Sequence, residues 1–547
     1  MQRKGYRSVL IRGLKRAFLG SLASRFILPP DTVSPRNFVV ICVLLSAFMS
    51  GLVLAQDGAV EGNPAAGMPG LESQLASTAI IGNVEFYACT LSAFAGQASR
   101  EAECATVAVP LNPLDSSSDT IDVFVVRLKA RGNNAHSDPI LMLAGGPGGA
   151  ASESYIYSDR QFEKASRQRD IYLIDQRGTG RSTRLQCEAH GEQLTLATLN
   201  LATVKAEINR CLAGFTLPPS LFTTSIAIRD FEFIRQALGV KQWNILGTSY
   251  GTRVAQHYVR IFPSAIRTAV LDAVVYPELN LGPDIALQSQ RALDVVLNRC
   301  ENDSQCIQAF PGLREGVQTL IKSLKGKGRR VEFENISSGR LESHIFTRDH
   351  LAIVLRMSLY QDEQSALLPL LLHEASANHN VAPMLRQALL VEKVMNASID
   401  PYMHNSVICA EDVPFYQPNP DLKKKLDATF IGGDLLEYIH ISCENWPVGY
   451  VDKAFKHPLV SDIPILLLSG TEDPITPPAY ADRASKKLTN ALHVIVNGQG
   501  HGVAALGCAP TLVAKFIDEA SVKQLDTACL DRMRPAPFFL TFNGPAP

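Results

Sequence analysis

The sequence has almost no net charge. Its 52 lysines and arginines are balanced by 53 acidic residues, which gives a formal net charge of −1. A protein that binds nucleic acid presents a concentrated basic surface to the phosphates. We therefore expect no nucleic-acid partner for this chain.

The common sequence patterns of metal and cofactor sites are also missing. The chain has no HExxH motif, no CxxC pair and no GxGxxG spacing in its glycine-rich loops. These spacings place zinc ligands on one helix face or loop, or bring backbone amides to a dinucleotide. We expect neither a metal nor an organic cofactor.

The N-terminal segment, residues 1–55, has the pattern of a targeting sequence. Basic residues precede an apolar run at 38–55, and Val-Leu-Ala at 53–55 offers small residues where a signal peptidase cleaves. The run is also just long enough to span a membrane. A cleaved signal peptide and an uncleaved signal anchor are thus both open, followed by a linker at 56–83. Either one predicts a secreted, periplasmic or outward-facing protein, with the anchor as its one membrane contact.

Cysteine usage agrees with export. Of 11 cysteines, Cys42 lies in the apolar run, which leaves an even ten. Disulfides persist in oxidising compartments, and closing a loop of about 15 residues contributes roughly 3 kcal/mol. The alternative is ten reduced, buried cysteines in a cytosolic protein. We expect pairs between sequence neighbours: Cys89–Cys104, Cys187–Cys211, Cys300–Cys306, Cys409–Cys443 and Cys508–Cys529.

Strand and helix patterns alternate along much of the chain. Continuous apolar runs, typical of parallel strands buried on both faces, are followed by segments with helical spacing. The alternation breaks over a mainly helical stretch and then resumes. We predict an α/β fold, a mostly parallel sheet with helices on both faces, in two parts at 84–277 and 458–547 with a helical cap inserted at 278–457.

A Gly-Thr-Ser-Tyr-Gly pentapeptide at 247–251 follows the predicted strand 243–246 and opens a predicted helix. A GxSxG match alone arises by chance about 0.2 times in a chain of this length. The strand–turn–helix setting, however, is that of a nucleophile elbow, which lifts a serine hydroxyl to the edge of the sheet. Ser249 is therefore the predicted nucleophile.

A serine nucleophile needs a base, and the base needs an acid that holds its tautomer. Asp473 follows a predicted strand at 463–468, and His501 lies in a glycine-rich loop after the last predicted strand at 492–496. The order Ser, Asp, His is the one expected for this kind of elbow. Glu472 is the alternative acid and His493 the alternative base.

A glycine-rich loop, Ala-Gly-Gly-Pro-Gly-Gly at 144–149, directly follows the predicted strand 140–143. In this setting a loop N–H and the N–H after the nucleophile, here Tyr250, form an oxyanion hole. Pro147 has no N–H to donate, so the donor is Gly145 or Gly146, of which we favour Gly146. One such donor is typically worth about 2.7–4 kcal/mol in the transition state.

Together these motifs resemble a known family. Gly-Gly-Pro-Gly at 145–148, Asp-Gln-Arg-Gly-Thr-Gly at 175–180, the Ser249 elbow, Asp-Pro at 473–474 and Gly-His-Gly at 500–502 resemble the prolyl-aminopeptidase branch of the α/β-hydrolases. The cysteine-containing segments at 408–412 and 443–447 are more specifically similar to the secreted tripeptidyl-aminopeptidase (TAP-like) subgroup. The resemblance covers about 84–529 and is weak across 278–400.

The resemblance implies an α/β-hydrolase fold with a helical cap and a serine exopeptidase that acts on peptide N-termini through an acyl-enzyme. Ala144 stands where prolyl aminopeptidases usually have His, which argues against strict proline specificity. Since a cationic N-terminus calls for carboxylates, Glu411, Asp412 and Glu444 are the candidate substrate-binding residues; solvated surface acids are the alternative. The same triad would also serve a carboxylesterase or lipase-like enzyme, whereas an inactive binding homologue would be expected to lack a triad member.

Overall fold

The computed structural model describes residues 77–92, 99–187, 200–326, 328–335, 339–416 and 419–545. The predicted targeting segment and most of the predicted linker, residues 56–83, lie outside these ranges. The end of that linker is a strand, β1 (Ser77–Ile81), because it pairs antiparallel with β2 (Val84–Ser92). In the described part of the chain, no helix combines the length and apolar character needed to cross a membrane.

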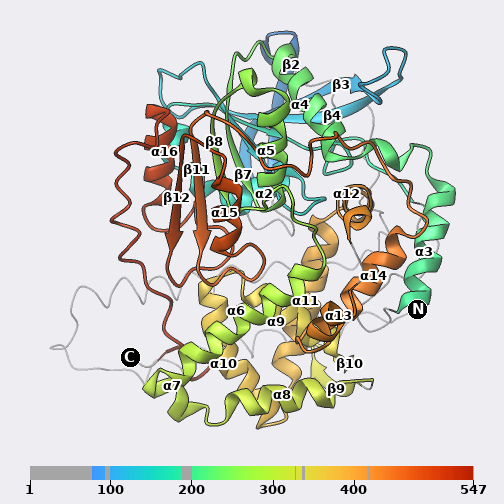
Figure 1. The fold of residues 1–547 in the computed structure, drawn as a ribbon, viewed down its shortest axis with the longest axis vertical. Coiled ribbons are helices and arrows are strands. Elements are labelled where there is room, and N and C mark those ends of the chain that lie inside the picture. Colours follow the sequence, from blue (N-terminus) through green and yellow to red (C-terminus); the bar gives the residue numbers. More distant parts are fainter. Residues whose placement is uncertain are drawn as a thin grey trace, which may run out of the picture. The chain divides into compact units, whose positions relative to one another are not determined.

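Ten strands form one sheet in the order β1-β2-β3-β4-β6-β5-β7-β8-β11-β12 (Figure 1). The strands from β1 to β4 are antiparallel to their neighbours, β4 is antiparallel to β6, and every pair from β6 to β12 is parallel. The strands after β2 are β3 (Ser99–Pro110), β4 (Thr120–Leu128), β5 (Ile140–Leu143), β6 (Ile171–Ile174), β7 (Trp243–Thr248), β8 (Ile266–Asp272), β11 (Ile465–Gly470) and β12 (Ala491–Val496).

Helices cover both faces of the sheet, because the central strands are apolar on both sides. In β5, Leu141 and Leu143 face one hydrophobic core, and Ile140 and Met142 face the other. The first core is covered by α3 (Leu201–Gly214), α4 (Thr224–Ala237), α5 (Tyr250–Ile261) and α15 (Pro478–Ser485). The second is covered by α2 (Ala151–Ser158) and α16 (Ala509–Glu519). Short 3₁₀ turns are η3 (Asp159–Phe162), η4 (Ala165–Arg167), η5 (Pro219–Leu221), η6 (Pro263–Ala265) and η7 (Val413–Phe415).

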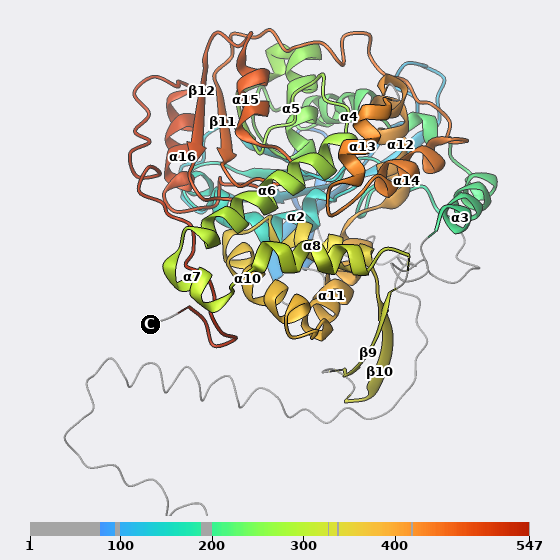
Figure 2. The same cartoon turned by 60° about the horizontal axis from the view of Figure 1, so that its bottom comes forward.

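The predicted helical cap lies between β8 and β11 in the sequence. Its helices are α6 (Pro283–Glu301), α7 (Ser304–Ala309), α8 (Leu313–Ser323), α9 (Arg348–Ser358), α10 (Asp362–Ser376), α11 (Ala382–Ser398), α12 (Pro401–Glu411), α13 (Pro420–Asp427) and α14 (Asp434–Cys443). Most of them share a separate hydrophobic core. The cap also contains a β-hairpin that the sequence analysis does not predict, β9 (Arg329–Glu334) with β10 (Leu341–Phe346), which Figure 2 shows at one edge of the cap.

All five predicted disulfides are present, with Cα–Cα distances between 5.0 and 6.4 Å. The Cys300–Cys306 bridge joins α6 to α7, and the Cys409–Cys443 bridge joins α12 to α14. The bridges therefore link helices of the cap as well as segments of the α/β core.

After α16 the chain returns to the cap. The C-terminal strap, which we define as residues 535–540, donates the Phe539 N–H to the Ala366 carbonyl of α10 at 3.1 Å. Phe538 is buried in the hydrophobic core of the cap. The strap thus joins the second part of the α/β core to the inserted helices.

Candidate active site

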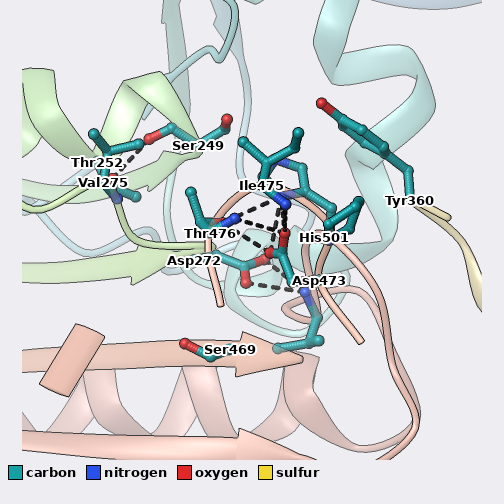
Figure 3. A network of polar contacts seen from close by, with 12 residues as sticks. Ser249, Thr252, Asp272, Val275, Tyr360, Ser469, Asp473, Ile475, Thr476 and His501 are labelled. Carbon is teal, nitrogen blue, oxygen red and sulfur yellow. Dashed lines mark hydrogen bonds and ion pairs between the residues drawn. The ribbon is translucent and has the colours of Figure 1, made fainter. Parts of the chain in front are cut away.

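Ser249 lies between β7 and α5 in a conformation that few residues other than glycine adopt. Its backbone φ is 57° and its ψ is −123°, and such values are retained only where the surroundings enforce them. Here the Ser249 N–H donates to the Asp272 carbonyl at 2.9 Å, and the Ser249 carbonyl accepts from the N–H and the hydroxyl of Thr252 at 2.9 and 2.6 Å. The strained turn presents the side chain at the carboxyl edge of the parallel strands (Figure 3).

The two glycines of the pentapeptide are required by close backbone contacts. A Cβ on Gly247 would lie 2.4 Å from the carbonyl oxygen of Gly251, and a Cβ on Gly251 would lie 2.2 Å from the carbonyl oxygen of Leu143. No side chain fits at such distances. The turn is therefore the predicted nucleophile elbow in geometry.

The structure brings Asp473 and His501 together. His501 Nδ1 lies 3.0 and 2.9 Å from the two carboxylate oxygens of Asp473, whose side chain is fully buried (Figure 3). The carboxylate also accepts the N–H groups of Ile475 and Thr476 at 2.8 Å and the Thr476 hydroxyl at 2.8 Å. Asp473 comes from the loop after β11 and His501 from the loop after β12, as the sequence predicts.

The electrostatics of this pair favour an ionised acid and a basic imidazole. Burial opposes the charged form of His501, but the Asp473 carboxylate outweighs it and raises the pKa of the imidazole. Burial likewise opposes the charge on Asp473, yet the His501 imidazole and the hydrogen bonds to the carboxylate lower the pKa of Asp473. An imidazolium formed here during a reaction would be stabilised.

The alternative acid and base point elsewhere. Glu472 lies 3.4 Å from Arg299, with its pKa raised by burial. His493 lies between Asp482 at 2.8 Å and the hydroxyl of Ser469 at 3.0 Å, which leaves both ring nitrogens occupied. The structure thus pairs Asp473, not Glu472, with the histidine beside the elbow.

The glycine-rich loop passes directly beside the nucleophile. A Cβ on Gly145 would lie 3.3 Å from the Ser249 Cβ and 3.9 Å from its Oγ. Gly146 has a φ of 124°, which a side chain would strain. Within the described ranges, no acceptor is found for the N–H of Gly146 or of Tyr250. Both predicted oxyanion donors are therefore free to bind a ligand oxygen.

A cavity of about 400 Å³ opens beside this site. Its lining includes Gly145 and Thr248 next to the nucleophile, His501, and parts of α2 and α10. Three carboxylates line it, those of Asp272, Asp362 and Glu363, and the lining contains no Lys or Arg among the residues that the structure describes. The cavity is therefore suited to a cationic group.

Sequence reasoning missed Asp362 and Glu363. They occupy the first turn of α10, where acidic residues are common simply because the helix dipole favours them. Asp362 accepts the Ala536 N–H of the C-terminal strap at 2.5 Å, and burial raises its pKa. Glu363 is exposed at the cavity. Only the tertiary fold brings this turn to His501.

The three acids that the sequence nominates for substrate binding do not line this cavity. Glu411 and Asp412 are fully buried. Glu411 accepts the N–H and hydroxyl of Thr224 at 2.7 and 2.9 Å, and Asp412 pairs with Arg253 at 2.9 Å. They fasten the end of α12 to the core. Glu444 is half exposed and pairs with Lys205 at 2.8 Å.

The fold and the site together define an α/β-hydrolase. Residues 138–309 match the family model described as "alpha/beta hydrolase fold", and residues 429–529 match the one described as "TAP-like protein". The resemblance predicted from the motifs is thus confirmed at both levels.

Similarity to individual proteins is more distant. The chain is 24% identical to "Putative hydrolase YuaR" of Escherichia coli (strain K12) over 485 residues, which is 82% of this chain and 92% of the relative. It is 28% identical to "Tripeptidyl aminopeptidase" of Streptomyces coelicolor over 218 residues, 34% of this chain and 39% of that protein. It is 27% identical to "Serine protease Hip1" of Mycobacterium bovis over 190 residues, 32% of this chain and 36% of that protein. The matches to the two peptidases thus span well under half of their lengths.

Proposed function

We propose that this protein is a secreted serine exopeptidase that releases short peptides or single residues from peptide N-termini through an acyl-enzyme. The observation that carries the proposal is the His501–Asp473 pair beside the strained Ser249, with His501 also lining a cavity that contains three carboxylates. The peptidases among the relatives support the reaction class. The five disulfides agree with an oxidising compartment.

In this mechanism the Ser249 hydroxyl attacks the scissile carbonyl while His501 accepts its proton. No hydrogen bond joins Ser249 Oγ to His501 among the described residues; such bonds are often long in an unliganded site and tighten when substrate binds. Asp473 holds the Nδ1–H tautomer, so that Nε2 is the proton acceptor. His501 then returns the proton to the leaving amine, and water attacks the acyl-enzyme by the same route.

The glycine-rich loop stabilises the negative charge that develops on the carbonyl oxygen. In this proposal the N–H groups of Gly146 and Tyr250 donate to it, since neither has another acceptor. Removing one such donor typically costs about 2.7–4 kcal/mol of transition-state stabilisation.

The exopeptidase character rests on the charge of the cavity. An unblocked peptide N-terminus carries an ammonium group, and a carboxylate within hydrogen-bond reach is its natural partner. We assign this role to Glu363 and Asp362, which line the cavity in which Glu411, Asp412 and Glu444 take no part. Glu363 is the more available of the two, because Asp362 already accepts a strap N–H.

The alternative is a carboxylesterase or lipase-like hydrolase that uses the same triad. The cavity lining also includes apolar side chains, among them Met142 and Leu506, which could pack against an acyl chain. Fold and triad do not distinguish amide from ester substrates.

The deciding experiment compares tripeptidyl, prolyl and aminoacyl p-nitroanilides, each with a free and an acetylated N-terminus, against short-chain p-nitrophenyl esters. We expect kcat/KM to fall at least tenfold when the N-terminus is acetylated, and all activity to vanish in Ser249→Ala. Equal rates for free and blocked amides, with faster esters, would favour the esterase. Activity that survives in Ser249→Ala would overturn the whole scheme.

A further inference from the structure

Asp272 is a buried carboxylate that the mechanism above does not use. It is the last residue of β8, its side chain is 2% exposed, and it lines the same cavity as His501. Its register partner in the neighbouring strand β7 is Thr248, the residue before the nucleophile. This position lies between the turn that carries Ser249 and the loop that carries His501.

Its main chain holds the nucleophile. The Asp272 carbonyl accepts the Ser249 N–H at 2.9 Å, at the one point where β7 turns sharply into α5. This bond satisfies a backbone donor that the strained conformation of Ser249 would otherwise leave without a partner.

Its side chain holds the loop of the base. Both carboxylate oxygens accept the Val503 N–H at 2.9 Å, and one of them also accepts the Ala504 N–H at 2.9 Å. These donors follow His501 by two and three residues. Gly502, between His501 and Val503, has a φ of 88°, so the loop turns tightly around the carboxylate. Asp272 thus contacts the backbone of both loops, the one that carries Ser249 and the one that carries His501.

Its charge also acts on the imidazole. Burial raises the pKa of Asp272 to about 6, and the charge of Asp473 adds to this, while the backbone N–H groups and His501 oppose it. The carboxylates of Asp473 and Asp272 raise the pKa of the His501 imidazole. Arg356, at the end of α9 in the cap, lowers it. No other charged group of the described residues is among the main influences on His501.

We propose that Asp272 is a positioning residue that fixes Ser249 and His501 relative to each other and adds a second negative charge beside the imidazolium. The proposal rests on the function proposed above only in requiring Ser249 and His501 as nucleophile and base. It does not depend on whether peptides or esters are the substrate.

The primary test is Asp272→Asn, which keeps the shape and one acceptor oxygen but removes the charge. Hydrolysis of p-nitrophenyl acetate is the readout, because any serine hydrolase of this type is expected to cleave it. We expect kcat to fall about 10²-fold, as misplacement of reacting groups causes, with little change in KM. The acid limb of the kcat/KM profile should move to lower pH, since His501 loses a neighbouring negative charge.

The matched control is Asp138→Asn. Asp138 also bonds buried groups, accepting from Arg169 at 3.1 Å and from Asn244 at 3.0 Å, but it lies at the other end of the parallel strands, before β5 and beside the start of β7. We expect it to lower thermal stability and to leave the pH profile unchanged.

A second variant keeps the proposal testable if the asparagine is accommodated by a shift of the loop. Asp272→Ala opens space in a cavity that solvent reaches, and added formate should restore part of its kcat, at least fivefold. An acid limb that does not move in Asp272→Asn, or a folded Asp272→Ala that formate does not restore, would overturn the positioning role. Activity in Ser249→Ala would instead contradict the proposed function.

Discussion

The main-chain carbonyl of Tyr360 accepts the N–H of His501 at 2.8 Å, and the two rings lie 4.7 Å apart. Tyr360 follows α9 and belongs to the cap, whereas His501 belongs to the α/β core. The neighbouring Gly500 packs so tightly here that a Cβ would lie 2.4 Å from the Tyr360 carbonyl oxygen. The cap therefore contacts the backbone of the proposed base itself, and its position and that of His501 are coupled.

The first prediction concerns the Tyr360 ring. Tyr360→Ala removes the aromatic wall over the imidazole, which admits water and reduces the burial that opposes the charged form of His501. We expect kcat to fall at least tenfold and the acid limb of kcat/KM to move to higher pH, opposite to Asp272→Asn. Tyr360→Phe, which keeps the ring, should behave like the wild type. A pH profile that is identical in Ala and Phe variants would contradict this view of the contact.

The second prediction concerns the hydroxyl of Thr476. It donates to Asp473 Oδ2 at 2.8 Å and lies 3.2 Å from His501 Nδ1. Thr476→Val leaves a buried carboxylate short of one donor, which costs about 1–3 kcal/mol of unfolding free energy, and should lower kcat about tenfold. Thr476→Ser restores the hydroxyl and should restore both. Denaturant unfolding and ester hydrolysis, measured on the same preparations, check the pair; a fully active valine variant would refute it.

The third prediction is a pH dependence. The pKa of His501 is raised above its ordinary value near 6.5, mainly by Asp473 acting against burial. A base must be neutral, so kcat/KM should rise with pH and reach half its maximum above pH 6.5. Because the folded pKa is the higher one, the stability that the ion pair contributes is present below about pH 6.5 and is lost as pH rises through the folded pKa. Asp473→Asn should move the acid limb to lower pH; an unmoved limb would exclude His501 as the titrating base.

The fourth prediction concerns Glu363, the exposed one of the two acids at the start of α10. Glu363→Gln should raise KM for free-amine tripeptidyl anilides about tenfold and leave acetylated substrates and esters unchanged, because only the former carry an ammonium group. Gln364→Glu, which adds charge at the next exposed position, is the control. If Glu363→Gln slows free and blocked substrates equally, the carboxylate acts on the catalyst and not on the amine.

The fifth prediction follows from the burial of Glu411. Burial raises the pKa of this carboxyl group from its ordinary value near 4.5 to about 7. The folded state then binds more protons than the unfolded state between pH 4.5 and 7, so this group lowers stability as pH rises through that window. Glu411→Gln keeps an acceptor for Thr224 and should flatten the decline of Tm with pH. A wild type and variant with parallel Tm curves would contradict the shift.

Much of the site was predictable because its residues carry local signals. Ser249, Asp473 and His501 each follow a mainly apolar strand, and parallel strands bring their carboxyl ends to one edge. The cysteine pairing followed sequence order. The roles of these side chains in catalysis stay predictions.

What the sequence could not provide are contacts made across the fold. The Tyr360 carbonyl has no side-chain signature, and Asp272 looks like any residue that ends a buried strand. Glu411 and Asp412 were expected to be accessible because two acids beside a cysteine resemble an exposed loop. Both are buried instead: Thr224 donates hydrogen bonds to Glu411, and Arg253 pairs with Asp412. The hairpin β9–β10 was missed because its short alternation is lost among helices.

The C-terminal strap has a consequence for any attempt to exchange caps between enzymes of this architecture. Although the cap helices form one continuous stretch of sequence, their hydrophobic core is completed by Phe538, more than 90 residues beyond α14. A cap transplanted through junctions after β8 and before β11 would therefore have a cavity in its hydrophobic core in place of Phe538. Asp362 would also lose the hydrogen bond from the Ala536 N–H. The cap is therefore discontinuous as a structural unit: it comprises the insertion together with the C-terminal strap that completes its core.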